Sequence, residues 1–600
     1  MLTVLVALGS AALYLVAYHT YGKWVGERIF GVDPERVAPS REINDGVDFV
    51  PSRKELVFGH HFTSIAGTGP IVGPAIAVVW GWVPALVWVL VGSIVMGAVH
   101  DFGSLIVSMR HRGRTIADLA GTVVNRRVRL LFMIVVVVGL WIVLAVFGLV
   151  IAAIFTLYPS SIVPVFAQIP IAVGLGIWLR RGGGLIAGTL VAVVLMYGTI
   201  AWSASIDWQQ SPLLPMWLTG ELGPVAFWTL VLLAYVSIAS VLPVQWLLQP
   251  RDYINTHQLL GAMGLLALGL LATRPEIVAD AVNLTPAPAA DGAMAPAMLP
   301  FLFVTIACGA ISGFHCLVAS GCSSRQLTSE ADARYVGFGA MLTEGMLAVL
   351  VILACAAGIG LGSQIDGPLG AELLTGREAW LHHYGTWGGD SGLASVLAPF
   401  IGGAANMIET IGLDRSFALA IMGVFVASFA ATTLDSATRL QRYVIAELVK
   451  GERDTVGPIR RAMGSRFGAT ALAVVSAGAL ALSDAWEVGL AEAGKGGMTL
   501  WPIFGATNQL LAGLALLVVT VWLVRQERPI WVTAVPMVFM LAMTAWAIAT
   551  LIGQFARSDG AVHLLAIAVM MLALEVWIVI EAAVLVKQRP LAGVDGVRSD

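Results

Sequence analysis

The sequence predicts an all-α integral membrane protein with about 15 transmembrane helices, ten of them arranged as a five-plus-five inverted repeat. Three observations predict this class. The 600-residue chain is 58% hydrophobic and 12% charged, whereas typical soluble domains are about 45–50% apolar and about 25% charged. Apolar stretches long enough to cross a bilayer recur along the chain. Two of them, in corresponding places of the two halves, are interrupted by glycine or proline.

The expected spans follow from the length of the apolar stretches. A helix needs about 20 residues to cross a hydrocarbon core ~30 Å thick. Stretches of about that length occur near residues 2–20, 60–81, 83–108, 129–157, 161–179, 184–203, 224–248, 258–273, 297–319, 336–361, 415–435, 467–484, 500–523, 530–553 and 563–586. Residues 391–412 form a sixteenth candidate.

The distribution of basic residues decides how that sixteenth segment is placed. If the N-terminus is outside and 391–412 does not cross, only five of the 34 Lys and Arg residues fall outside: Arg274, Arg377, Arg415, Lys495 and Arg557. If 391–412 crossed the membrane fully, the basic residues that follow residue 435 would lie outside, against the positive-inside rule. We therefore expect a re-entrant or surface helix at 391–412, and a cytoplasmic C-terminus in the inner membrane.

The second span contains an unusual concentration of helix-breaking residues. Residues 59–74 have the sequence GHHFTSIAGTGPIVGP, with four glycines and two prolines. Proline removes a helical donor and clashes with the preceding turn. Unpaired backbone at membrane depth is tolerated only where protein buries it or a polar cavity adjoins it. The pattern favours a broken helix that binds substrate, although glycine and proline in membrane helices also produce simple kinks.

A second interrupted span, 224–248, lies five helices later and has the opposite expected orientation. It contains Ser240-Val241-Leu242-Pro243. The sequence therefore divides into an N-terminal helix with a cytoplasmic loop (1–59), two inverted repeats (60–203 and 224–435) and C-terminal peripheral helices (467–586). This division depends on topology, because the two halves show no clear similarity of sequence.

We expect the substrate to bind between the two breaks. Gly67, Thr68 and Gly69 permit close approach of the backbone, and helix N-termini there attract a carboxylate. Side chains expected to add hydrogen bonds are Gln245, Ser312 and His315.

Ionisable residues at membrane depth cost about 2.5–3.5 kcal/mol each on insertion scales and are functional candidates. The proton-coupling candidates are Asp101, Glu344, His60, His61 and Asp435. We favour Asp101 slightly as the proton carrier, with Glu344 as its competitor. A structural role is the alternative for each, above all for Asp435, which has Arg439 at i+4. Glu575 is expected to pack outside the core.

Several other functions are disfavoured by missing motifs. His60, His61, His100 and Asp101 lack the HExxH pattern or second carboxylate cluster of a metalloenzyme. No Walker, GxSxG or dinucleotide-binding motif is present. We expect no catalysis, cofactor, resident metal or nucleic-acid partner. The expected partners are a small-molecule substrate, a coupling ion and the bilayer, and the four cysteines are expected to pack as small apolar residues.

Motifs between about residues 44 and 515 resemble the carbon starvation protein A (CstA) family. They include Phe58-Gly59-His60-His61-Phe62, Gly97-Ala98-Val99-His100-Asp101-Phe102, Pro250-Arg251-Asp252-Tyr253, Ile306 through His315, and Trp501-Pro502-Ile503-Phe504-Gly505 with Asn508-Gln509. The resemblance implies an inner-membrane importer of peptides or small carboxylates such as pyruvate, coupled to proton entry. It also implies the LeuT-like fold of the amino acid–polyamine–cation (APC) superfamily. The chain departs from the family pattern at Val426, where a glutamate is usual, and at Ser436 and Cys322.

Two other functions remain open at this point. Carbonyl groups of the broken second span, with the hydroxyls of Ser320 and Ser323, offer oxygen ligands for sodium coupling. A membrane nutrient sensor is the third possibility, disfavoured because no signalling domain follows the last expected helix.

Overall fold

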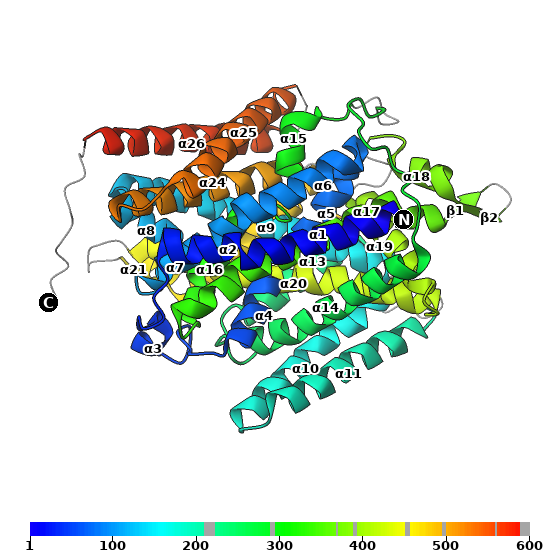
Figure 1. Ribbon diagram of the computed structural model, residues 1–600, viewed down its shortest axis with the longest axis horizontal. Coiled ribbons are helices and arrows are strands. Elements are labelled where there is room, and N and C mark those ends of the chain that lie inside the picture. The colour runs from blue at the N-terminus through cyan, green and yellow to red at the C-terminus, as the bar shows by residue number, and fades with distance from the viewer. Residues whose placement is uncertain are drawn as a thin grey trace.

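The computed structural model describes residues 1–208, 222–288, 294–367, 370–387, 393–450, 457–494, 500–557 and 561–588. These residues form a bundle of helices, most of which run roughly along the longest axis of the molecule (Figure 1). The hairpin of α10 (Ile162–Arg180) and α11 (Leu185–Ala204) lies along one edge, and α25 (Trp531–Phe555) and α26 (Val562–Gln588) lie along the opposite edge (Figure 1).

The elements of the first half are almost entirely helical. They are α1 (Leu2–His19), α2 (Tyr21–Trp24), η1 (Val25–Phe30), α3 (Pro39–Ile43), α4 (Lys54–Ile65), α5 (Gly69–Ala77), η2 (Val78–Trp80), α6 (Trp82–Val91), η3 (Gly92–Gly97), α7 (Ala98–Met109), α8 (Ile116–Val123), α9 (Arg126–Leu157), η4 (Pro159–Ser161), α10 (Ile162–Arg180), α11 (Leu185–Ala204), α13 (Pro224–Ala239) and α14 (Leu248–Thr273).

The second half adds one small hairpin of strands, β1 and β2, which pair antiparallel with Ser363 opposite Leu374. Its elements are α15 (Met298–Thr305), α16 (Gly313–Gly321), η5 (Ser323–Arg325), η6 (Glu330–Asp332), η7 (Arg334–Phe338), α17 (Gly339–Ala356), η8 (Gly358–Leu361), β1 (Ser363–Gly367), β2 (Gly370–Leu374), α18 (Gly376–Tyr384), α19 (Leu393–Glu409), α20 (Arg415–Lys450), α21 (Pro458–Met463), α22 (Arg466–Ala481), α23 (Ala485–Val488), α24 (Trp501–Arg525), α25 (Trp531–Phe555) and α26 (Val562–Gln588).

Side-chain caps mark where several helices begin. Asn125 accepts a hydrogen bond from the N–H of Val128 and so begins α9, and Thr115 accepts one from Asp118 at the start of α8. Each cap satisfies one of the four backbone donors that a helix N-terminus leaves without a partner. The polar segment before α9 therefore sets the depth at which this very apolar helix begins.

Within the described residues, 11 helices are long and apolar enough to span a membrane, or 12 if the bent pair α4 and α5 is one span. This confirms a helical protein with many candidate membrane spans. It does not confirm the expected number of about 15. The three remaining expected spans correspond to the shorter apolar helices α13 and α22 and to 297–319, which the structure divides into α15 and α16.

The expected helix at 391–412 is present as α19, from Leu393 to Glu409, and residues 391–392 lie outside the described part. It packs against α17, α20 and η8. Its Phe400, Ile401 and Ala404 are fully buried. The helix is therefore buried against these elements, and its re-entrant or surface course relative to the membrane stays a prediction.

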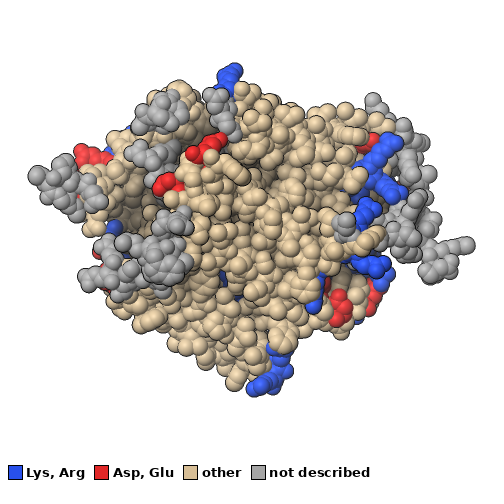
Figure 2. All heavy atoms as spheres, turned by 180° about the vertical axis from the view of Figure 1, so that it is seen from behind, with Lys and Arg blue, Asp and Glu red and all other residues tan. Residues whose placement is uncertain are grey.

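The centre of the bundle is formed by α9, α20 and α24, whose apolar side chains are almost wholly buried, whereas α1, α11 and α26 expose most of theirs. On the face in Figure 2, uncharged atoms cover a broad middle region, and Lys and Arg side chains gather mainly toward one end. An uncharged belt of this kind is what a hydrocarbon core requires.

Candidate functional site

The second expected span is broken, as the sequence predicts. Helices α4 and α5 are separated by residues 66–68 and bend by 42°. Thr68 precedes α5, its side chain is fully buried, and its hydroxyl has no hydrogen-bond partner in the described structure. Pro70 occupies the first turn of α5, where its missing N–H is no loss. The break therefore lies inside the protein.

The segment that faces this break is 306–312, between α15 and α16. A Cβ on Gly69 would lie 2.3 Å from the sulfur of Cys308, and one on Gly73 would lie 2.4 Å from the carbonyl oxygen of Thr305. Glycine fits at both positions because Gly69 lies against the side chain of Cys308 and Gly73 lies against the backbone of Thr305 and Ile306. Two broken helices thus cross at their breaks, deep in the bundle.

The interruption that the sequence predicts near 240–243 is present, but it is a different feature from the break at 306–312. The chain does leave helical geometry after Ala239, but there α13 ends and a separate 26-residue helix, α14, begins at Leu248. Gln245 lies in that connection, where its Nε2 donates to the carbonyl oxygen of Gly46 at 2.9 Å in an exposed setting. Gln245, which was expected to hydrogen-bond the substrate, is thus bonded to the segment before α4 in this structure.

Ser312, in contrast, lies at the second break and is held there by α24. Asn508 donates from Nδ2 to the Ser312 hydroxyl at 3.0 Å, and its Oδ1 accepts from the N–H of Phe314 at 2.9 Å. The amide thus caps the N-terminus of α16 from a neighbouring helix. The motif comparison included Asn508, but nothing in the sequence pattern assigned it this role.

Four buried ionisable residues gather immediately beyond the second break, and we call them the Asp101 cluster: His100, Asp101, His315 and Glu344. Asp101 on α7 lies 2.8 Å from Nδ1 of His100 and 2.9 Å from Nδ1 of His315 on α16. Nε2 of His315 lies 3.4 Å from Glu344 on α17. All four side chains are fully buried.

The two carboxylates of this cluster differ in their hydrogen bonds. Both oxygens of Asp101 have an imidazole partner, whereas neither oxygen of Glu344 has a hydrogen bond in the described structure. Tyr14 adjoins Glu344 along α17, because a Cβ on Gly345 would lie 2.4 Å from its hydroxyl. The cluster therefore connects α1, α7, α16 and α17 through groups that can exchange protons.

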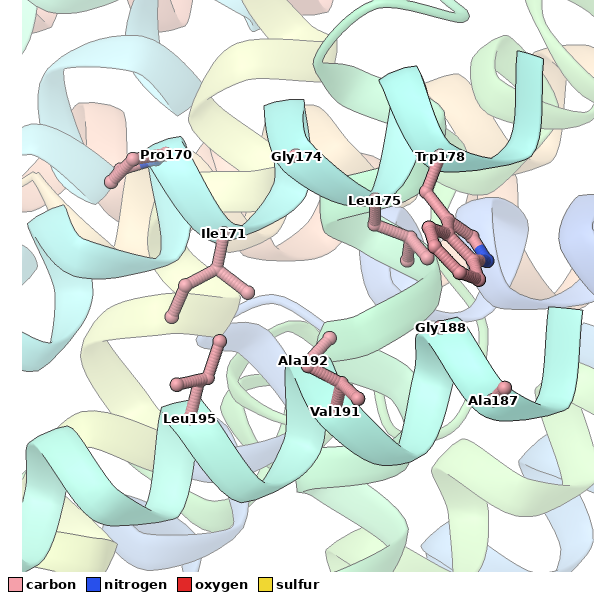
Figure 3. Close-up of a pocket in the computed structure, with 10 residues that line it drawn as sticks. All are labelled: Pro170, Ile171, Gly174, Leu175, Trp178, Ala187, Gly188, Val191, Ala192 and Leu195. Atoms are coloured by element: carbon pink, nitrogen blue, oxygen red, sulfur yellow. The ribbon is translucent and has the colours of Figure 1, made fainter. Parts of the chain in front are cut away.

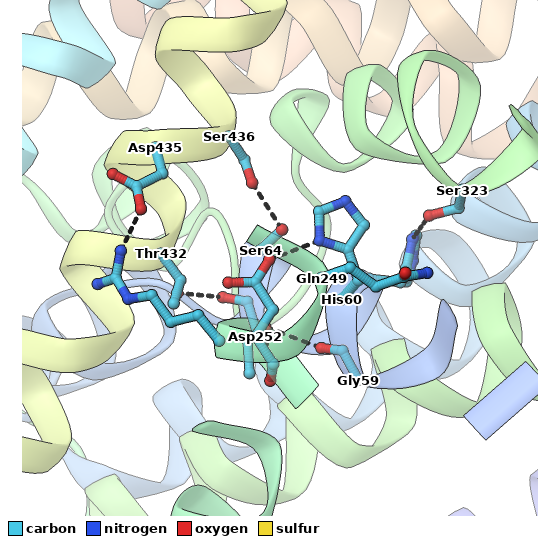
Figure 4. Close-up of polar contacts among 12 residues, drawn as sticks. Gly59, His60, Ser64, Gln249, Asp252, Ser323, Thr432, Asp435 and Ser436 are labelled. Carbon is cyan, nitrogen blue, oxygen red and sulfur yellow. Dashed lines mark hydrogen bonds and ion pairs between the residues drawn. The ribbon is translucent and has the colours of Figure 1, made fainter. Parts of the chain in front are cut away.

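A second set of buried charges lies where α4, α14 and α20 meet, and we call it the Asp435 cluster: His60, Arg251, Asp252, Asp435 and Tyr235. Figure 4 labels His60, Asp252 and Asp435 of this cluster. His60 Nδ1 lies 2.5 Å from Asp252, and Arg251 forms an ion pair with Asp435. The Tyr235 hydroxyl donates to Asp435 at 3.0 Å. The side chains of the two ion-paired couples are about 1% exposed.

The expected local pair of Asp435 with Arg439 is not the one that forms. Asp435 instead pairs with Arg251 of α14, and Arg439 pairs with Asp48 in the segment before α4. Arg251 and Asp252 were the residues that sequence reasoning missed. They lie in the first turns of α14, where hydropathy predicted a loop. Their place in a family motif was the signal that could have identified them.

The other predicted residues are distributed around these two clusters. His61 lies 2.8 Å from the Ser323 hydroxyl, and Ser320 donates to the carbonyl oxygen of Cys316 at 2.6 Å. Gly67 packs against α20, because its Cβ would lie 2.4 Å from Thr433 Oγ1. Glu575 is buried on α26, away from both clusters. Of the four residues considered for a metal, His100 pairs with Asp101, whereas His60 and His61 contact Asp252 and Ser323. In the described part of the chain, no three His, Cys, Asp or Glu side chains are arranged to hold one metal ion.

Hydroxyl groups of α20 reach the last carbonyl groups of α4. Thr432 donates to the carbonyl oxygen of Thr63 at 3.0 Å, and Thr433 donates to that of Ser64 at 2.9 Å. The hydroxyls of Ser64 and Ser436 lie 2.8 Å apart (Figure 4). These contacts satisfy carbonyl groups that the helix break would otherwise leave without partners.

Known proteins resemble the chain over most of its length. A peptide transporter CstA of Campylobacter jejuni is 32% identical over 572 residues, covering 90% of this chain and 79% of its own. The pyruvate/proton symporter BtsT of Escherichia coli is 31% identical over 602 residues, covering 90% and 81%. A crystal structure of the Eremococcus coleocola manganese transporter aligns over 90% of this chain and 99% of that one, at 11% identity and a TM-score of 0.41. The family model of carbon starvation protein CstA matches residues 2–547, so the chain belongs to the CstA family.

Proposed function

We propose that this protein is an inner-membrane secondary transporter, and not an enzyme, which imports peptides or small carboxylates such as pyruvate by proton symport. Its relatives include a peptide transporter and a pyruvate/proton symporter. The observation that carries the proposal is the placement of the Asp101 cluster directly beyond two crossing helix breaks. A substrate site and a proton-exchanging site are thereby joined through one short helix, α16.

The substrate binds where the two breaks cross. Residues 66–68 and 306–312 leave helical geometry there, and Thr68 offers a hydroxyl without a partner. The N-termini of α5 and α16 begin at these breaks and favour a carboxylate through their N–H groups and dipoles. Gly69 and Cys308 touch in this structure, so the two breaks must separate for a ligand to enter.

The proton is exchanged in the Asp101 cluster. Because of the hydrogen bonds in this cluster, we propose Glu344 as the proton carrier in place of Asp101. Glu344 can gain or lose a proton without breaking a hydrogen bond, whereas Asp101 would give up one of its two imidazole contacts. His315 lies between them and extends from the helix that begins at the substrate break. Movement of α16 on substrate binding would therefore change the distance from His315 to Glu344.

The repeat is proposed in a revised form, in which each five-helix unit begins with a broken helix. The first unit begins with α4 and α5, and the second begins with α15 and α16, in place of residue 224. Residues 224–273, which form α13 and α14, then lie between the two units. We retain about 15 crossings and place the N-terminus outside, because the end of the bundle that bears α3, α8 and α21 carries most of the basic residues (Figures 1 and 2).

Sodium coupling is the second candidate, and one contact favours it. Ser320 and Ser323, expected to hold the ion, have other partners. The hydroxyls of Thr432 and Thr433 instead lie on the last carbonyl groups of α4, and oxygen atoms of this kind suit a hard cation. Replacing both threonines by valine would distinguish sodium coupling from proton coupling. Only a sodium-driven transporter would then lose the dependence of its uptake on the sodium gradient.

Proteoliposomes with separately imposed gradients test the proposal. Labelled pyruvate and labelled dipeptides are supplied with an inward proton gradient, an inward sodium gradient or neither. We expect accumulation with the proton gradient alone, abolished by a protonophore. Accumulation with the sodium gradient alone would identify sodium as the coupling ion. If the protein binds both substrate classes and takes up neither, transport of these substrates is refuted.

A further inference from the structure

The strongest unexplained feature of the molecule is an apolar groove between α10 and α11. Its volume is about 500 Å³. Small residues at Gly174, Ala187 and Gly188 leave the space open, and Ile171, Trp178 and Leu195 form its walls (Figure 3). The groove extends from Trp178, near the turn of the hairpin, to Pro170 eight residues earlier, or about 12 Å along the helix.

The groove opens toward the surrounding membrane. The hairpin forms the edge of the bundle (Figure 1), and its outward side chains are exposed, among them Ile186 at 77% and Val194 at 69%. Neither the Asp101 cluster nor the crossing breaks contribute a lining residue. The groove is therefore separate from the proposed transport site, and its natural surroundings are hydrocarbon chains.

Two exposed arginines, Arg180 and Arg181, lie at the turn where the groove begins. In the described structure neither has a carboxylate partner, and Arg180 lies over the ring of Trp246 at 4.1 Å. Trp178, which forms the wall at this end, donates from its indole N–H to the carbonyl oxygen of Gly184. Tryptophan and arginine together at the end of a span are typical of the lipid headgroup region.

We propose that this groove is a binding site for an anionic phospholipid, with one acyl chain between α10 and α11 and the phosphate on Arg180 and Arg181. The apolar groove runs from the arginines at the hairpin turn toward the middle of the two helices. An acyl chain extends from its headgroup in the same direction. A second copy of the protein fits less well. Symmetry about the membrane normal would bring the arginine pairs of both copies to the same depth at one interface, where like charges repel.

Delipidated protein in detergent, titrated with phosphatidylglycerol or phosphatidylcholine and followed by native mass spectrometry, tests the site. Each basic residue at an anionic headgroup favours binding about fivefold, so the pair should give about a 25-fold preference for phosphatidylglycerol. The double variant Arg180→Gln/Arg181→Gln should lose that preference while still binding both lipids. Equal affinity of the unaltered protein for the two lipids would overturn the assignment of the headgroup.

A matched pair of glycine variants tests the acyl-chain part. Gly174 lines the groove, Gly198 on α11 does not, and a Cβ at either would meet nothing within 4 Å. Gly174→Leu should fill the groove and lower lipid binding at least tenfold, and Gly198→Leu should leave it unchanged. Retained lipid binding by Gly174→Leu would refute the groove as the site. The proposal would also be refuted if the unaltered protein is a dimer and Gly174→Leu, but not Gly198→Leu, is a monomer. Transport need not change in either variant, so the result is independent of the proposed function.

Discussion

At the scale of single residues, the two buried clusters differ in how their charges are supported. Every charged group of the Asp435 cluster has an oppositely charged neighbour, which is the usual requirement for burying a charge. In the Asp101 cluster, Glu344 lies 3.4 Å from the imidazole of His315 and has no hydrogen bond in the described structure. The first arrangement is suited to holding helices together, and the second is suited to exchanging a proton.

The first prediction concerns the proton carrier. Glu344→Gln should abolish accumulation of substrate against a gradient and retain exchange of labelled for unlabelled substrate, because exchange does not require release of the proton. Asp101→Asn should weaken both, since it removes an acceptor that positions His315. Uptake and exchange are measured in the same proteoliposomes. An Asp101→Asn protein that exchanges normally and fails to accumulate would return the carrier role to Asp101.

The second prediction concerns the Arg251–Asp435 ion pair. Arg251→Met leaves a buried carboxylate without its partner and should destabilise the protein by about 3–5 kcal/mol. The double variant Arg251→Met/Asp435→Leu removes both charges and should recover most of that loss. Thermal unfolding in detergent measures the four members of the cycle. If the double variant is as unstable as the sum of the single ones, the pair makes no direct contribution.

At the scale of elements, the short segments outside the bundle are connected by specific polar contacts. His383 at the end of α18 lies 3.0 Å from the hydroxyl of Ser363 in β1. Burial, together with the neighbouring His382, lowers the pKa of His383 from 6.5 to about 4. The folded protein therefore keeps this imidazole neutral at pH values where an unfolded chain would protonate it.

The third prediction follows from the sign of that shift. Because the folded pKa is the lower one, the contribution of His383 is complete above pH 6.5 and is lost as the pH falls toward 4. The largest possible loss is ~3 kcal/mol, at about 1.4 kcal/mol per pKa unit. His383→Gln keeps a hydrogen-bonding side chain and should flatten the unfolding temperature between pH 7 and 5. His382→Gln, at an exposed position, should flatten it much less, and equal slopes for all three proteins would contradict the assignment.

At the scale of the whole molecule, the orientation in the membrane can be tested without a cysteine-free background. The four native cysteines are all buried. Val37, after η1, and Val282, after α14, are 65% and 54% exposed. With the N-terminus outside, these two valines lie on opposite sides of the membrane.

The fourth prediction uses this pair. A membrane-impermeant maleimide added to intact cells should label Val282→Cys and leave Val37→Cys unlabelled, and inverted vesicles should show the opposite pattern. The unaltered protein should remain unlabelled in both. The reverse pattern of labelling would invert the proposed topology, and labelling of both variants from one side would require a different number of crossings between residues 37 and 282.

The sequence by itself determined the membrane class, the family and the first helix break. Each of these depends on local information: composition, motif order, and the inability of proline and closely spaced glycines to continue a helix. It also supplied most of the ionisable residues at membrane depth, because their cost in hydrocarbon makes them conspicuous against the apolar background.

Only the tertiary structure decided which of those residues meet. Local pattern predicted an interruption at 240–243, where α13 does end, but it did not predict the break at 306–312 that adjoins Gly69 through the side chain of Cys308. The i+4 spacing favoured Asp435 with Arg439, but Arg251, 184 residues away in the chain, is the partner. Helix packing brings together groups of any sequence separation, and a buried charge takes whichever opposite charge the packing delivers. Hydropathy along the chain therefore cannot predict which buried charges form a pair.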